Sequence, residues 1–122
     1  MREYTHLMND ILKASEDIEA FTRGMSFKEF IADEKTRSAV LYKFAVMGEA
    51  TKILPESIRT QYPDIPWRSI AGLRDKVIHG YIGVDYELLW ETIVAKLPSV
   101  IEGLHNILDD ITKGQIVDRN SR

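Results

Sequence analysis

A short string around residue 75 gathers most of the groups in this chain that could act on a phosphate. Arg74, Lys76 and His79 put three hydrogen-bond donors around one position. Gly80, which follows directly, allows a backbone or ligand to approach closely because it has no Cβ. Asp75 lies four residues before His79, so on a helix the carboxylate can orient the imidazole and favour its protonated form. The string therefore predicts a phosphate-binding site.

The spacing of Arg74 and His79 limits how these two groups can meet. Five residues of helix correspond to about 500° of rotation and about 7.5 Å of rise, so contact needs long side chains or a distorted helix end. A structural interpretation also stays open, in which 74–76 form an exposed polar face and His79 caps a helix through the macrodipole. His6, in a first helical turn, and His105, among leucines and isoleucines, fit surface or packed histidines.

Composition excludes several classes of site. The chain has 122 residues, 44% of them hydrophobic, which suits one domain with a real core. With no cysteine, it has no disulfide framework, thiolate metal site or cysteine nucleophile. Charges interrupt every apolar run before the roughly 18 residues needed to cross a bilayer, and residues 1–21 lack a signal-peptide core. We expect a cytoplasmic protein without membrane association.

The net charge of -3 hides an uneven distribution. Residues 1–34 carry 4 basic and 8 acidic side chains, residues 35–80 carry 8 and 4, and residues 81–122 carry 4 and 7. Only the middle third could attract an anion by its own charge, although solvated helix faces would give the same pattern.

Apolar residues recur at spacings of three and four along most of the chain, which predicts helices. The first runs from Tyr4 and stops at Gly24; Ser26 to Glu29 has the form of a capping box that starts a short helix. We further predict helices at 34–54, at 55–62 with Pro55 as first residue, at 67–78, and from Asp85 to about residue 112 with a bend at Pro98.

These elements predict an all-α fold, an antiparallel up-and-down bundle of four main helices with additional short helices. No alternating run of β-branched residues with hairpin turns indicates a sheet. Residues 1–112 are expected to form a single domain. Residues 113–122 lack periodicity and are expected to form a flexible tail.

Two segments carry a resemblance to a known family. The segment PDIPWRSIAGLRDKVIHGYIGVDYELLWETI, with FAVMGEATKILPESIRTQYP before it, resembles the HepT-like ribonucleases of the HEPN superfamily. The family signature is an arginine, four to six residues, a histidine, any residue and a tyrosine. Arg74, His79 and Tyr81 match it, and the likeness covers about residues 35–95.

The resemblance implies a function and a mechanism. Such proteins are toxins of type VII toxin–antitoxin pairs, HEPN-like dimers whose arginine and histidine line a cleft between subunits and cut RNA without a metal. The antitoxin, an MntA-like nucleotidyltransferase, adds AMP to the motif tyrosine, which here is Tyr81. Metal-free cleavage needs proton transfer and positive charge on the phosphate, roles that we assign to His79 and Arg74 respectively. The expected partners are RNA, the antitoxin and further copies of the chain, as a homodimer or higher oligomer.

Supporting roles are less specific. Glu49 corresponds to a carboxylate near the cleft in the family, although a surface glutamate fits its position equally well. Arg68 could extend the RNA-binding surface, as could Lys76. Asp75 departs from the family, where asparagine is commoner after the motif arginine, and its charge would weaken RNA binding. Trp67 and Trp90 are interpreted as core or dimer contacts.

Two other functions stay open. The chain could be a non-catalytic HEPN subunit that docks a nucleotidyltransferase and contributes only surface. It could also be a plain helical assembly module, which would leave the cluster at Gly80 and Tyr81 unexplained. A short nucleotidyltransferase encoded next door would support either of the first two functions.

Overall fold

The protein is an all-α bundle, as expected. The structure, a computed structural model, describes residues 4–77 and 83–120, apart from the side chains of Arg74 and residues 115–120, and contains no β-strand within those ranges. The elements are α1 (Thr5–Thr22), α2 (Phe27–Ala32), α3 (Glu34–Ile53), α4 (Glu56–Gln61), α5 (Trp67–Val77), α6 (Tyr86–Glu91), the π-helical segment η2 (Thr92–Lys96) and α7 (Leu97–Asn120).

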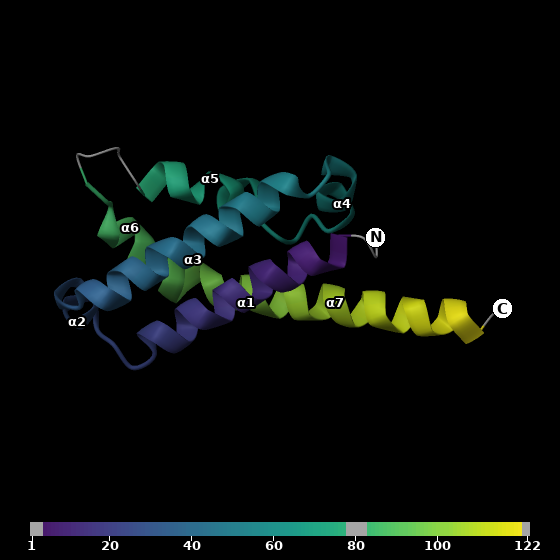
Figure 1. Cartoon of the computed structure of the whole chain (residues 1–122), viewed down its shortest axis with the longest axis horizontal. Coiled ribbons are helices and arrows are strands. Elements are labelled where there is room, and N and C mark those ends of the chain that lie inside the picture. The colour runs from purple at the N-terminus through teal and green to yellow at the C-terminus, as the bar shows by residue number, and fades with distance from the viewer. Residues whose placement is uncertain (1–3, 78–82, 121–122) are drawn as a thin grey trace.

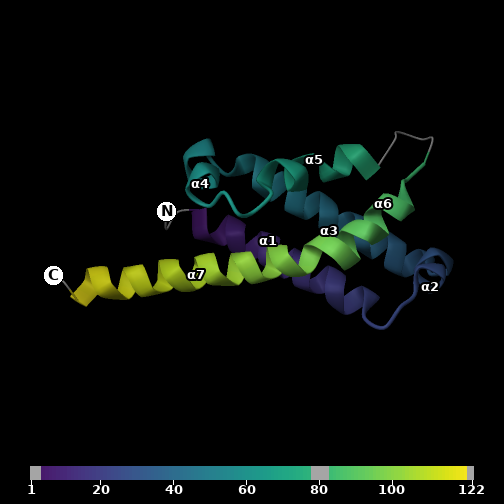
Figure 2. The same cartoon turned by 180° about the vertical axis from the view of Figure 1, so that it is seen from behind.

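The four long helices alternate in direction. In Figure 1, α1 and α5 run one way, and α3 and α7 run the other. α1 packs against both α3 and α7, while α3 also packs against α5. Seen from behind in Figure 2, α7 projects past the other helices toward its C-terminal end. This is the antiparallel up-and-down arrangement that the helical periodicity predicts.

The core follows the apolar stripes of these helices. Its fully buried side chains come from six elements and include Met8, Ile11, Ile18, Phe30, Val40, Phe44, Met47, Val77, Leu89, Leu97 and Leu104. The few buried hydroxyls are satisfied within their own helix. Ser15 Oγ, for example, donates to Ile11 O at 2.7 Å, which avoids the cost of an unpaired buried polar group. Within the described ranges, no helix has the length and apolarity of a membrane span.

Local signals set most helix boundaries where the sequence predicts them. Gly24 has a φ of 77°, so it ends α1 in a conformation that favours glycine. Ser26 and Glu29 form the predicted capping box, with each side chain accepting from the other residue's backbone N–H. The side chains of Asp33 and Asp85 cap α3 and α6, accepting from Thr36 N and Leu88 N.

Three boundaries differ from the expectation. Pro55 is the N-cap of α4 rather than its first helical residue. The last helix is divided into α6 and α7 by η2, in which Leu97 N–H donates to Thr92 O five residues earlier. Pro98 has no N–H and its ring crowds the carbonyl of Val94, so a widened turn just before it relieves the conflict. α7 continues to Asn120, so residues 113–120 are helical, while the flexibility of 113–122 stays a prediction.

Candidate active site

The signature residues lie on α5 and in the segment of the chain that follows it, before α6. Arg74 is on the last turns of α5, and its side chain is outside the described residues, as are His79, Gly80 and Tyr81. Two described residues that flank residues 78–82 are held together, because Asp85 N–H donates to Val77 O at 2.7 Å. The structure therefore places the signature segment between a buried helix end, at Val77, and a capped helix start, at Asp85.

α5 is held by its apolar face and presents its polar face outward. Ile70, Leu73 and Val77 are buried, as the periodicity predicts. Close approach to α3 occurs at Gly48, where a Cβ would lie 3.5 Å from the carbonyl oxygens of Ile70 and Ala71. Asp75 and Lys76 are exposed near the C-terminal end of α5.

Lys76 borders a groove between α5 and the η2–α7 segment. The groove has an apolar floor that includes Phe44 and Met47, and Lys96 of η2 borders it too. Both lysines are exposed. Lys96 was not singled out from the sequence, and nothing in its local pattern distinguishes it; only the fold brings it beside Lys76.

Arg68 lies at the opposite end of α5 from Lys76. Eight residues of helix separate the two, which corresponds to about 12 Å of rise. Arg68 instead borders a second, open hollow together with Arg59 of α4. The connection from α4 to α5 is fixed there by Trp67 Nε1, which donates to Tyr62 O at 2.9 Å. Burial, followed by the charge of Asp110, raises the pKa of Tyr62.

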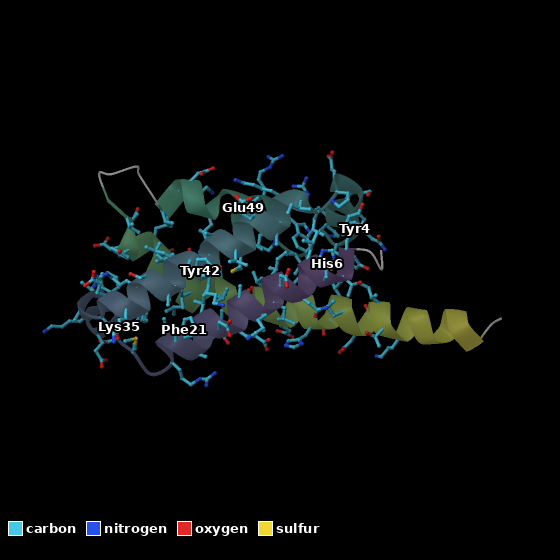
Figure 3. The ribbon with its side chains drawn as sticks, in the orientation of Figure 1. Tyr4, His6, Phe21, Lys35, Tyr42 and Glu49 are labelled. Carbon is cyan, nitrogen blue, oxygen red and sulfur yellow. The ribbon has the colours of Figure 1, made fainter. Side chains whose placement is uncertain are left out.

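The other candidates lie outside these two hollows. Glu49 is exposed on α3, and Figure 3 shows it along the bundle, away from α2. His6 lies near the start of α1, at the other end of the molecule. His105 Nε2 is 3.2 Å from Glu16 Oε2 in an exposed pair between α7 and α1. Both histidines therefore fit the surface roles expected of them.

An aromatic cluster fixes the element that follows the signature. Phe30 of α2 is fully buried against Trp90 and Tyr86 of α6, with ring centroids 5.0 and 6.2 Å apart. Phe27 adds a contact with Trp90, and the guanidinium of Arg37 lies 5.4 Å from the centre of the Tyr86 ring. Trp90 is thus a core contact, as interpreted, and so is Trp67, which is buried. Arg37, which the sequence alone did not indicate, ties α3 to the start of α6.

No group of three or more His, Cys, Asp or Glu side chains suited to a metal ion occurs among the described residues. The described part of the site is instead cationic and hydrogen-bonding, with Lys76 and Lys96 on one groove and Arg59 and Arg68 on another hollow. Such groups suit an anionic ligand.

Comparisons with known proteins agree with this interpretation. The family model for ribonuclease HepT-like proteins matches residues 11–107. A candidate RNase of Methanocaldococcus jannaschii is 45% identical over 102 residues, covering 84% of each chain. A candidate ribonuclease HepT of Thermococcus cleftensis is 42% identical over 99 residues, covering 81% of this chain and 90% of that one. A second candidate RNase of M. jannaschii is 41% identical over 110 residues, covering 90% of this chain and 91% of that one. No solved structure matches at a significant level.

The fold and these matches define a helical protein of a ribonuclease class. The chain belongs to the ribonuclease HepT-like family, as the resemblance of its signature segment indicated.

Proposed function

We propose that this chain is a metal-independent endoribonuclease and the toxin of a type VII HepT/MntA-type pair. The observation that carries the proposal is the family match, which spans residues 11–107 and so includes Arg74, His79 and Tyr81 in one segment. The fold supports it, because the turn that bears the signature is anchored at both ends and has exposed lysines nearby. We place its action in the cytoplasm.

The proposed chemistry is attack of the RNA 2′-hydroxyl on the adjacent phosphorus. The new O–P bond closes a 2′,3′-cyclic phosphate while the bond to the 5′-oxygen breaks, so one proton must leave the 2′-oxygen and one must reach the 5′-oxygen. His79 performs one of these transfers. Arg74 offsets the charge of the pentacoordinate phosphate. A second subunit, Tyr81 or water supplies the other proton transfer.

Two further parts of the proposal concern partners. The active form is a homodimer or higher oligomer in which two signature segments line a common cleft. Its antitoxin is an MntA-like nucleotidyltransferase that adds AMP to the hydroxyl of Tyr81. The added phosphate places negative charge beside Arg74 and His79, which would repel RNA and block access to both groups.

The decisive experiment is cleavage of RNA in EDTA by the purified chain, compared with His79→Ala and Lys76→Gln at matched fold and oligomeric state. We expect products ending in 2′,3′-cyclic phosphate, a loss of about 10² to 10⁴-fold for His79→Ala, and a far smaller loss for Lys76→Gln. The Lys76→Gln variant is the matched control, because it removes a nearby cation without removing the proton-transfer group.

A chain without modification at Tyr81 that leaves several RNAs intact would contradict the proposal. The interpretation as a non-catalytic subunit that docks a nucleotidyltransferase would then be the better account. Products with a 3′-hydroxyl, or activity that EDTA abolishes, would contradict the proposed chemistry even if RNA were cut.

A further inference from the structure

The hollow where α4 meets α5 contains a buried donor without an acceptor. Arg59 Nε is buried, and it has no hydrogen-bond partner within the described part of the chain. A buried N–H left unpaired costs about 1 to 3 kcal/mol, and more for a charged group. Arg59 borders the hollow, but its Nε is shielded from solvent, so a ligand there meets the guanidinium first and supplies the missing acceptor only when the side chain shifts toward it. The acceptor must be one that suits a guanidinium, which favours an anion.

A second cation and a helix end face the same hollow. Arg68 is exposed and borders it, together with the hydroxyl-bearing residues Thr60 and Ser69. Pro66 precedes α5 and has no side-chain oxygen, so it does not cap the first backbone N–H groups of this 11-residue helix. These groups add to the positive end of the macrodipole. Glu56 is the one acidic side chain lining the hollow, so the two arginines leave it net positive.

The hollow lies at one end of α5, and the signature turn lies at the other. The 11 residues of α5 span about 16 Å, which corresponds to about five stacked nucleotides at about 3.4 Å each. A strand with a phosphate at the signature turn could therefore reach the hollow with another phosphate along the same strand. Between Ser69, beside the hollow, and Asp75, near the other end, α5 presents the small residues Ala71 and Gly72, which are half-buried.

We propose that Arg59 and Arg68 bind a phosphate of the RNA backbone about five nucleotides from the cleavage point. This rests on the proposed function for the identity of the ligand as RNA, but not for the existence of an anion site. The proposed contact carries no base information, because the two arginines and the first N–H groups of α5 act on a phosphate of the RNA backbone. It sets a minimum substrate length, since an RNA too short to span α5 reaches one end only.

The site itself is tested with inorganic phosphate on the whole chain, at constant ionic strength kept with chloride. The reporter is the ¹⁵N–¹H resonance of Arg59 Nε, identified by its loss in Arg59→Lys. We expect a saturable shift that Arg68→Gln abolishes and Arg23→Gln preserves. Arg23 is an exposed arginine at the end of α1, at the opposite end of the molecule. No shift in the unmodified chain, or one unaffected by Arg68→Gln, would overturn the site.

Its use by RNA is tested with 2′-O-methyl oligonucleotides, which lack the attacking hydroxyl and so report binding alone. For about twelve nucleotides we expect Arg59→Gln and Arg68→Gln each to weaken binding about fivefold and to reduce the salt slope by about 0.7. For about three nucleotides we expect neither variant to differ from the unmodified chain. Rescue of the longer oligonucleotide's affinity by Arg59→Lys would show that charge suffices, whereas loss in Arg59→Lys as well would assign the role to the guanidinium group.

A failure of this inference can be distinguished from a failure of the proposed function. If the unmodified chain cuts RNA but both arginine variants bind the longer oligonucleotide normally, this inference is wrong and the proposed function stands. If the unmodified chain neither binds nor cuts RNA, the proposed function is wrong and RNA is excluded as the ligand of the hollow. The phosphate titration still decides whether the anion site exists.

Discussion

Asp75 is the residue whose charge most directly opposes the proposed reaction. It is exposed beside the signature arginine, where a carboxylate repels a phosphate. We expect Asp75→Asn to lower KM for RNA by about two- to fivefold at low salt, with the gain shrinking as ionic strength rises. Steady-state cleavage at several salt concentrations measures this, with Asp10→Asn on the exposed side of α1 as the control. A raised KM would show that Asp75 supports RNA binding instead of weakening it.

Asp17 gives a residue-scale prediction about stability and pH. Its carboxylate lies 2.9 Å from Lys43 Nζ and 3.2 Å from Lys13 Nζ, and the hydrogen bond from Lys43, followed by that from Lys13, lowers its pKa below 3.8. Because the folded pKa is lower than the unfolded one, the stabilisation is fully present above about pH 4 and is lost as pH falls through the folded pKa.

We therefore expect Asp17→Asn to lower the free energy of unfolding by about 0.5 to 1 kcal/mol at pH 7, a modest value because the ion pair is partly exposed. The difference between the two chains should shrink as pH falls below about 4, because protonation of Asp17 removes the charge that both lysines contact. Urea denaturation at a series of pH values tests this. A difference that persists unchanged as pH falls would mean that packing, and not charge, causes it.

At the scale of elements, the position of α6 depends on α2. Phe30 is fully buried and contacts both aromatic rings of α6, whereas Phe27 of α2 contacts only the ring of Trp90. We expect Phe30→Ala to cost about 3 to 5 kcal/mol and Phe30→Leu clearly less, because leucine leaves a smaller cavity. Urea denaturation measures the change in the free energy of unfolding for each variant.

Amide hydrogen exchange tests whether the loss is local to α6. Leu89 N–H, which bonds to Asp85 O in the first turn of α6, should exchange faster in Phe30→Leu than the buried positions of α1 do. Equal acceleration in both helices would contradict a specific role for the aromatic cluster in holding the end of the signature turn.

The elements themselves could be predicted from local signals because most of their boundaries are set locally. The capping box at Ser26, the glycine at 24 and the spacing of apolar residues each act within a few residues. The division of the last helix could not be predicted to the same degree. Pro98 indicates a bend. The position of the widened turn in η2, however, depends on the packing of α6 against α2, a contact between distant parts of the chain.

At the scale of the whole molecule, the bundle topology follows from short connections between amphipathic helices, and the structure agrees with it. The residues of the candidate site, in contrast, could be predicted only in part. The signature positions could be predicted because their types and spacing are local. Lys96 and Arg59 could not, since each joins a hollow only through packing of helices that are far apart in sequence. The roles of Arg74, His79 and Tyr81 stay predictions that the cleavage experiment decides.

The oligomeric state is the last prediction, and it follows from proton counting. The signature supplies one histidine per chain, whereas cleavage requires two proton transfers. A second subunit at the same cleft would supply the second histidine. We expect sedimentation to give a homodimer or a larger even-numbered species, and specific activity to fall on dilution below its dissociation constant. His79→Ala subunits mixed with unmodified ones should lower activity by more than their fraction, because mixed dimers would carry only one histidine. A chain that sediments as a monomer and keeps its specific activity on dilution would require Tyr81 or water as the second group.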